Sequence, residues 1–535
     1  MVIMMLTVTV SHLQESRTFV RDATGLVRSL SPFDSMAINI SVITVGCMFY
    51  CLAFVGASFG TNIAIGFVLA AALSLPFVLL YSTFSAAMPN TGGDYVWVSR
   101  VLHPSLGFTI NLYITLIVLS WPAINASAIM PAFISTGLIG TSIITGNSAY
   151  ASLASTLNQQ WVIFLITALP LVLLLGTRKS IRFIWVGFLA GGLAVLIIIA
   201  TFLSAGHSAF VSNFNAVSSV KYDAVLTSAT GNGFLLPITL VGTFVASVFA
   251  LINTLGYNFN SYYVGEIKQA NSMKTQLIAS LGSLLIFAVL GYLLYFSLYS
   301  FVGTDFVNSV LFLFNNVPSR YPLPFVMPVA SAYIAYATNI AFLPLLVNVL
   351  LAISYSISNC AFAFVAVRNF FAWSFDRVLP AKLASVDTRG SPWFAVLVAT
   401  GIAEMWAVVE LFTPISAMLA YDVTGFAIAW AIVSVTAIIF PYVRKEMFQS
   451  IPESLRGKMF GTYKVTLVGI IGLFAAVLMV YASLWPTYIG ALNPVYFMTM
   501  LGPFLIGIPL FFAAKYIRGR QGIFLNLAYR VIPPE

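Results

Sequence analysis

The sequence predicts an all-α polytopic membrane protein with twelve transmembrane helices. Of its 535 residues, 60% are hydrophobic and only 7% are charged, and the mean hydropathy is +0.99. Soluble domains carry about 25% charged residues. The apolar residues also form runs of roughly 20 residues, which is the length that an α-helix needs to cross a bilayer. We therefore expect most of the chain to lie in lipid.

Twelve such runs follow one another, separated by charged residues or by clusters of proline, glycine and asparagine. The third and the eighth are long enough to tilt strongly or to extend beyond the bilayer. The predicted spans are about 34–57, 62–88, 95–137, 159–177, 183–205, 235–263, 276–302, 333–372, 392–411, 415–441, 465–487 and 494–516.

Lysine and arginine set the predicted orientation, because cytoplasmic loops of membrane proteins carry an excess of both. With the N-terminus inside, all 24 basic residues except Lys221 and Arg320 fall on the cytoplasmic side. We therefore expect a multi-pass protein of the plasma membrane that contacts lipid and has both termini in the cytoplasm. The net charge of +9 follows from this distribution and does not indicate a nucleic-acid partner.

The sequence lacks motifs for catalysis or cofactor binding. It has no dinucleotide-binding glycine fingerprint, no Walker A loop and no Cys/His spacing for zinc. Its three histidines, His12, His103 and His207, lie far apart in the chain. We expect no cofactor and no enzyme activity. A membrane-embedded enzyme would need a constellation of catalytic side chains. A channel would need a repeated selectivity filter. Neither is visible in the sequence.

The stretch from Val241 to Lys268 is apolar enough to span the bilayer, yet its middle contains Asn253, Gly256 and Asn258. In lipid, such an interruption is tolerated only where the backbone faces protein or a water-filled cavity. The unpaired N–H and C=O groups of a broken helix bind small ions or zwitterions. We interpret this stretch as half of a substrate site and expect a matching break in an earlier helix.

The first span supplies the matching candidate at Gly46, followed by Cys47 and Met48. If the helix unwinds there, the backbone N–H groups of residues 46–49 point into the cavity. They would form the partly positive start of a half-helix, which suits a carboxylate. The alternative interpretation is a glycine that only lets another helix pack closely.

Three sequence motifs favour the broken-helix interpretation. The first is AAMPNTGGDYVWVSR at residues 86–100, with HPSLGF at 103–108. The second is LGYNFNSYYVGEIK at 255–268, and the third is RNFFAWSFDRVLP at 368–380. Together with the helix count, the motifs resemble those of the amino acid–polyamine–organocation (APC) transporter superfamily. There they mark the junction of helices two and three, helix six and the end of helix eight.

The resemblance implies two inverted repeats of five helices, with helices one and six broken and helices eleven and twelve added. The implied organisation is a cytoplasmic segment 1–33, a first repeat 34–205, an outer loop 206–234, a second repeat 235–441, helices eleven and twelve 465–516, and a cytoplasmic tail 517–535.

In such a fold a zwitterion needs few ionised side chains. Its carboxylate would rest on N–H groups of the break in helix one, and its ammonium on carbonyls that the break in helix six frees. The two asparagines near the second break either bind the substrate or join helices to one another. The predicted substrate-binding residues are Gly46, Cys47, Met48, Ile252, Asn253, Leu255, Gly256 and Asn258.

Sodium and protons are both candidates for a coupling ion. Sodium-coupled relatives bind the ion between helix one and hydroxyls of helix eight, where Ser356 and Ser358 are candidates. Some proton-coupled relatives carry a lysine in helix five, where this chain has Gly191. Asp422, predicted about two turns from the outer end of helix ten, is a candidate for binding a proton or a cationic amine. The alternative for Asp422 is a carboxyl at the outer interface.

Charged residues also gather at predicted cytoplasmic helix ends, where ion pairs would latch the inner gate. Glu266 and Arg368 are the gating candidates, and the alternative is that each charge merely reaches out to water. The other members of the group are Asp94, Arg100, Lys268 and Asp376.

These observations predict a secondary active transporter that moves an amino acid by alternating access. The alternatives within the same fold are a carrier of polyamines, nucleobases or other organic cations. Paired acids in the outer vestibule would favour a polyamine, and only Asp422 is available there.

Overall fold

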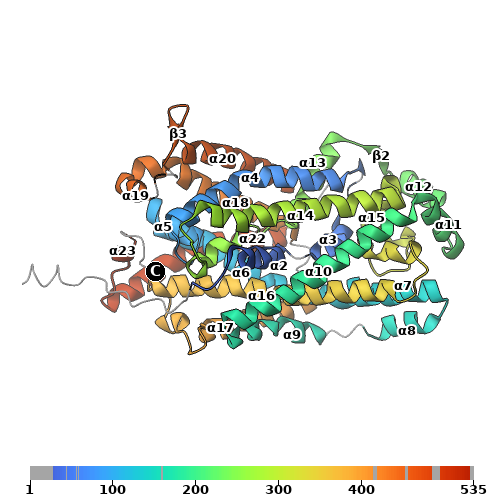
Figure 1. The fold of residues 1–535 in the computed structure, drawn as a ribbon, viewed down its shortest axis with the longest axis horizontal. Coiled ribbons are helices and arrows are strands. Elements are labelled where there is room, and N and C mark those ends of the chain that lie inside the picture. The colour runs from blue at the N-terminus through green and yellow to red at the C-terminus, as the bar shows by residue number, and fades with distance from the viewer. Residues whose placement is uncertain are drawn as a thin grey trace, which may run out of the picture.

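Long helices lie nearly parallel to the long axis of the molecule and form a bundle (Figure 1). The computed structural model describes residues 28–529 apart from 44, 56, 58, 158–160, 414–418, 452, 454–455 and 485–493. Apolar side chains fill the interior and also cover the outside, where Leu193, Leu285 and Phe474 are each about half exposed or more. An apolar outer surface of this kind suits a bundle surrounded by lipid.

In the described part of the chain, ten helices are long and apolar enough to cross a membrane. The predicted spans 159–177 and 235–263 contain shorter apolar helices, Val162–Leu175 and Leu240–Ile252, so the count of twelve stays a prediction. The ten long spans are α2 with α3 (Pro32–Tyr50), α4 (Ile63–Ala87), α6 to α7 (Pro104–Thr145), α10 (Thr177–Ala205), α14 (Met273–Val302), α16 (Leu343–Phe375), α17 (Trp393–Phe412), α18 (Leu419–Val443), α20 (Lys464–Ser483) and α22 (Pro494–Arg520).

Two apolar helices are interrupted in mid-course. The first stops after Ile43 and resumes at Cys47, with Gly46 in the turn between. The second stops after Ile252, and the chain turns through Gly256 before a 3₁₀ helix begins. The elements on either side are α2 (Pro32–Ile43), α3 (Cys47–Tyr50), the 3₁₀ helix η1 (Cys51–Phe54), α13 (Leu240–Ile252) and the 3₁₀ helix η4 (Phe259–Glu266).

The predicted third span, 95–137, combines two separate helices. Pro104 begins the second of them at a position where its missing N–H costs nothing. The ring of His103 caps that helix by accepting a hydrogen bond from the Ser105 N–H at 3.2 Å. The elements are α5 (Asp94–Val101), α6 (Pro104–Ala128), the π-helix η2 (Ile129–Ile134) and α7 (Ser135–Thr145).

The segments predicted as outer loops, 206–234 and 303–332, contain short helices. Phe210 and Phe214 lie one turn apart and pack on Phe306, with ring centroids 5.3 and 5.1 Å away. This helical spacing of aromatic residues sits inside a polar sequence, which is why the sequence suggested a loop. The elements are α11 (His207–Val217), α12 (Tyr222–Gly231), α15 (Thr304–Asn316), η5 (Pro318–Arg320) and η6 (Ala330–Tyr336), and the predicted eighth span, 333–372, becomes a helix only at Leu343.

The remaining short elements connect the long helices. They are α8 (Ser148–Thr156), α9 (Val162–Thr167), η3 (Leu169–Leu175), η7 (Ala381–Ala384), α19 (Lys445–Ser450) and α23 (Leu525–Ala528). Strand β1 (Phe59–Gly60) pairs in parallel with β2 (Leu235–Ile238), and β3 (Lys458–Met459) pairs antiparallel with β4 (Thr462–Tyr463). The first pair ties the chain beyond η1 to the start of α13.

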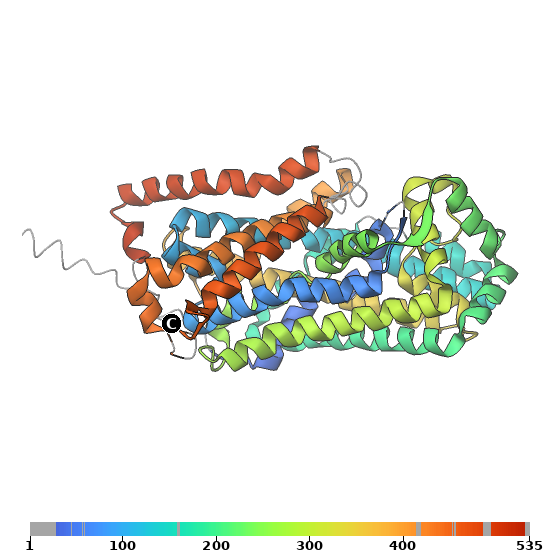
Figure 2. The same ribbon diagram turned by 90° about the horizontal axis from the view of Figure 1, so that it is seen from above.

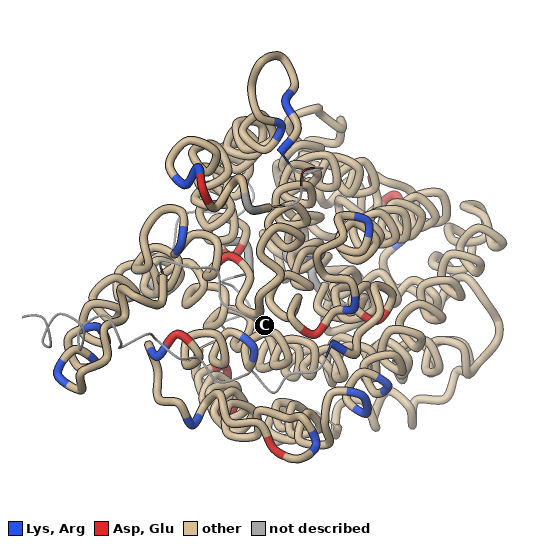
Figure 3. The backbone as a smooth tube through the Cα atoms, turned by 60° about the vertical axis from the view of Figure 1, so that its left-hand side comes forward, with Lys and Arg blue, Asp and Glu red and all other residues tan. Residues whose placement is uncertain are grey.

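The interrupted helices occupy the middle of the bundle. Helix α2 contacts α10, α14, α16 and η4, whereas α22 packs on α6 along one edge (Figure 2). One end of the bundle carries α5, α19 and the β3–β4 hairpin, and we call it the basic end. Figure 3 turns this end toward the viewer and shows lysine and arginine segments on its loops and helix ends. The opposite end carries α8, α11, α12 and α15 (Figure 1).

Candidate substrate site

A cavity lies where the two interrupted helices meet α6, α16 and α18. Three of the predicted substrate-binding residues, Cys47, Ile252 and Leu255, line it, and so does Asp422. The other lining residues are Val42, Ile43, Trp121, Ile124, Asn125, Tyr355 and Phe362. The described lining is therefore mostly apolar, with one carboxylate.

A buried amide holds the two interrupted helices together. The Asn39 Nδ2 group of α2 donates to the carbonyl oxygen of Tyr257 at 2.7 Å and to Oδ1 of Asn260 at 3.0 Å. The Tyr263 hydroxyl in turn donates to Asn39 Oδ1 at 3.1 Å. One side chain thus satisfies a carbonyl that the broken helix would otherwise leave open.

The first interruption leaves fewer free N–H groups than the sequence suggested. The Met48 N–H donates to the Val45 carbonyl at 3.2 Å, and the Phe49 N–H donates to the Gly46 carbonyl at 3.1 Å. The expectation that the N–H groups of residues 46–49 all face the cavity is therefore wrong for these two, because the turn bonds them locally. Gly46 does not line the cavity. A side chain at this position would clash with Tyr355, because its Cβ atom would lie 2.6 Å from Cδ2 of that ring.

The second interruption leaves backbone carbonyls open. The N–H groups of Thr254 and Leu255 both donate to the Leu251 carbonyl, at 2.9 and 3.1 Å. No donor among the described residues reaches the carbonyl oxygens of Ile252, Asn253 and Leu255. Because Ile252 and Leu255 line the cavity, acceptor groups without donors border it on this side.

Gly256, Asn253 and Asn258 are buried beside the cavity without lining it. Gly256 has φ +111°, a conformation that L side chains rarely adopt, and a side chain there would meet Val42. Asn253 donates to the Phe249 carbonyl of its own helix at 2.7 Å, and both polar side-chain atoms of Asn258 have no hydrogen-bond partner among the described residues. Among the described residues, therefore, neither asparagine joins two helices.

Asp422 is 3% exposed and lies in the first turn of α18. Its Oδ2 accepts a hydrogen bond from Nε1 of Trp121 at 2.8 Å. It lines the cavity between the interrupted helices. Sequence reasoning missed Trp121 and Asn125, although polar-tipped side chains one turn apart in an apolar span were a usable signal.

Both serines proposed for ion coupling donate their hydroxyl hydrogens within their own helix, and the Ser358 oxygen also accepts from Nδ2 of Asn125 at 2.9 Å. Ser356 donates to the Ala352 carbonyl at 2.7 Å, and Ser358 donates to the Tyr355 carbonyl at 2.6 Å. At Gly191, a side-chain carbon would lie 2.4 Å from Ser354 Oγ, so the site where some relatives carry a lysine is closed by packing. No group of three or more His, Cys, Asp or Glu side chains suited to a metal occurs in the described part of the chain.

Glu266 and Arg368 form a buried two-pronged ion pair at the basic end. The Arg368 Nε lies 2.7 Å from Oε1 of Glu266 and its Nη2 lies 3.1 Å from Oε2. The guanidinium also lies 3.6 Å from the ring centroid of Phe364. This pair ties η4, the continuation of the second interrupted helix, to α16.

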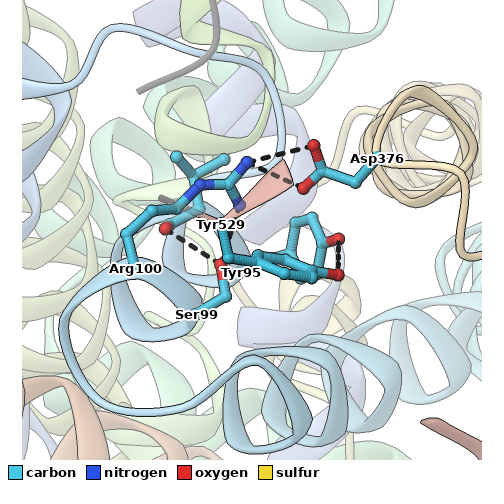
Figure 4. A network of polar contacts seen from close by, with 6 residues as sticks. Tyr95, Ser99, Arg100, Asp376 and Tyr529 are labelled. Atoms are coloured by element: carbon cyan, nitrogen blue, oxygen red, sulfur yellow. Dashed lines mark hydrogen bonds and ion pairs between the residues drawn. The ribbon is translucent and has the colours of Figure 1, made fainter. Parts of the chain in front are cut away.

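A second buried ion pair joins α5 to α16. The Arg100 Nη2 lies 2.8 and 3.0 Å from the two carboxylate oxygens of Asp376, and its Nη1 donates to Ser99 Oγ at 2.7 Å (Figure 4). Beside it, the hydroxyls of Tyr95 and Tyr529 lie 2.9 Å apart, which brings the end of the chain against α5. Four of the six charged residues expected at cytoplasmic helix ends thus form two ion pairs, while Lys268 is exposed.

Asp94 is buried in α5, the helix that also carries Arg100, and is held by neutral donors. The hydroxyls of Tyr262 and Tyr81 donate to its Oδ2 at 2.7 and 3.0 Å, and Nδ2 of Asn111 donates to its Oδ1 at 2.8 Å. Asp94 lies in α5, outside the ten candidate spans. Burial raises the pKa of its carboxyl from 3.8 to about 6, against the lowering effect of these hydrogen bonds.

Comparison with known families identifies the group to which the chain belongs. A model described as amino acid permease matches residues 30–507, which includes both interruptions and the cavity. The chain therefore belongs to the amino acid permease family of the APC superfamily, as the three motifs predicted. Membership makes it a multi-pass membrane transporter rather than an enzyme.

Replacing Arg368 by Met is predicted to lower the free energy of unfolding by about 3–5 kcal/mol, because Glu266 would keep a buried charge without a partner. Chemical unfolding in detergent measures the change. The double variant Glu266→Gln with Arg368→Met should recover most of the loss. Lys268→Met, at an exposed neighbouring position, is the control and should stay within about 0.5 kcal/mol of the parent. A single Arg368→Met variant as stable as the parent contradicts this account.

Asp94→Asn is predicted to change the dependence of stability on pH. As pH rises, the carboxyl stays protonated to a higher pH in the folded protein than in the unfolded chain. Its contribution to stability therefore falls between about pH 4 and about pH 6. The total loss is about 3 kcal/mol, since each pKa unit corresponds to about 1.4 kcal/mol. The melting temperature of the variant minus that of the parent should therefore rise across this window and level off above it. A difference that is constant from pH 4 to pH 8 would count against a buried, neutral carboxyl.

Proposed function

We propose that this member of the amino acid permease family is a secondary active transporter of amino acids that works by alternating access, with the cavity between its interrupted helices as the substrate site. It would act in the plasma membrane with both termini in the cytoplasm. A proton or a sodium ion would drive it.

The observation that carries this proposal is the open turn after α13. The carbonyl oxygens of Ile252, Asn253 and Leu255 have no donor among the described residues, and they follow the C-terminal end of a 13-residue helix. Such an end carries partial negative charge, and an ammonium group supplies the missing donors. A backbone that stays open inside a bundle costs free energy unless a ligand uses it.

The substrate carboxylate would bind at the interruption of the first helix, residues Gly46 to Met48. Because the Met48 N–H already donates to Val45, binding there requires that turn to open. We therefore expect the turn at Gly46 to rearrange when the substrate arrives. Tyr355, which packs directly on Gly46, would move with it.

The two buried ion pairs support an alternating-access mechanism. Each joins α16 to a neighbour at the basic end: Glu266–Arg368 to η4 and Arg100–Asp376 to α5. Opening a path at this end would break them, and a latch of a few kcal/mol suffices to bias such an equilibrium. We assign Glu266 and Arg368 to the gate on this ground.

The cavity chemistry bears on the alternative substrates of the same fold. A polyamine carries several ammonium groups, and among the described lining residues only Asp422 offers a carboxylate. A nucleobase carries no ammonium group to use the open carbonyls. An amino acid therefore fits better than either.

The proposal predicts that at least one of the twenty amino acids raises the melting temperature of the purified full-length protein in a concentration-dependent way. A ligand at a hundredfold excess over its Kd stabilises the folded state by about 2.7 kcal/mol through mass action. The amino acid that shifts the melting temperature should also be taken up into proteoliposomes. Stabilisation by a polyamine or a nucleobase but by no amino acid would favour those alternatives instead.

A further inference from the structure

The described wall of the cavity contains one residue that can carry a formal charge at neutral pH. Among the described residues that line it, Asp422 alone is ionisable as an acid or a base at neutral pH, and lysine, arginine and histidine are not represented. The single hydrogen bond that the Asp422 side chain makes within the described structure comes from a neutral donor, Nε1 of Trp121 at 2.8 Å. No cation among the described residues of the cavity wall therefore balances a charge on this carboxyl group.

The other polar groups around the cavity reinforce this negative character. The open carbonyls after α13 belong to Ile252, Asn253 and Leu255, and two of these residues line the same cavity as Asp422. The Asn125 amide nitrogen is turned to Ser358 and Asn359, at 2.9 and 3.3 Å. The acceptors thus outnumber the donors available to a ligand.

The rest of the wall is apolar. Val42 and Ile43 come from α2, Ile124 from α6 and Phe362 from α16. All four are nearly fully buried, at 2–3% exposed. A ligand that fits such a wall has one cationic head and an apolar body, because a second positive charge would be desolvated without a partner.

We propose that Asp422 binds the ammonium group of the substrate and that the cavity therefore selects primary amines with a single positive charge and an apolar side chain. This inference rests on the proposed function in that it takes the cavity as the substrate site. The inference goes beyond the proposed function because it names a side-chain partner for the amine. It also makes the ligand's carboxylate dispensable for binding. In an amino acid, the same contact orients the molecule with its ammonium group between Asp422 and the turn after α13.

Three ligands that share an isobutyl group test the proposal by calorimetric titration of the purified full-length protein. Leucine carries both charged groups, isopentylamine only the ammonium, and 4-methylpentanoate only the carboxylate. We expect isopentylamine to bind with a Kd within about tenfold of that of leucine, and 4-methylpentanoate to bind about a hundredfold more weakly or not at all.

Asp422→Asn should weaken isopentylamine binding by about a hundredfold, the usual consequence of removing one partner of a buried charge pair. Asparagine is nearly isosteric and still accepts a hydrogen bond from Trp121, so the melting temperature without ligand should stay close to that of the parent. Trp121→Phe removes the hydrogen bond but keeps the carboxylate, and should retain isopentylamine binding within about tenfold. Glu404→Gln, which changes an acid of α17 that does not line the cavity, is the matched control and should leave binding unchanged.

Three results overturn the inference: no binding of isopentylamine to the parent protein, equal binding to Asp422→Asn and the parent, or binding of 4-methylpentanoate as tight as that of leucine. Failure of the proposed function shows in a different measurement. If no amino acid is taken up into proteoliposomes while isopentylamine still binds in an Asp422-dependent manner, the transport proposal fails and the assignment of Asp422 stands.

Discussion

The Asn39 amide joins two helices that are both incomplete, and the geometry of the cavity depends on that contact. Inside a bilayer each backbone N–H and C=O must find a partner within the protein, so a broken helix is stable only where its neighbours supply them. Asn39 donates to the Tyr257 carbonyl and to Asn260, and it accepts from Tyr263. The turn after α13 is thereby fixed against α2, and the carbonyls that Asn39 does not reach are left beside the cavity.

Charge is distributed along the bundle in two different ways. In the cavity, the Asp422 carboxyl accepts a hydrogen bond from a neutral indole N–H and has no cationic partner among the described residues. At the basic end, Glu266 and Asp376 are each matched to an arginine over two short contacts. Buried ion pairs of this kind contribute little net stability, because their attraction only offsets the cost of removing both charges from water. Separating the two charges is costly if either one stays buried without a partner. They suit a gate that is either fully closed or fully open.

Much of this architecture follows from the sequence because bilayer thickness sets the length of an apolar run. Glycine and asparagine inside such a run marked both interruptions, at Gly46 and Gly256.

Other features left no comparable signal. Tyr355 and Phe362 line the cavity, yet an aromatic residue in an apolar helix looks the same whether it faces a cavity, a neighbour or lipid. The local hydrogen bond that engages the Met48 N–H depends on the path of a turn, which composition does not specify. The phenylalanines of α11 were concealed by the polar residues between them.

The central claim is that the cavity between the interrupted helices is the path of the substrate, and blocking it tests that claim most directly. Ile124→Trp places an indole into the cavity wall, whereas Leu285→Trp places the same side chain on the exposed face of α14, where Leu285 is 48% exposed. The measurement is the initial rate of amino acid uptake into proteoliposomes that contain equal amounts of folded protein. The account predicts that Ile124→Trp loses uptake while Leu285→Trp transports at the parental rate. Equal uptake by the two variants would contradict it.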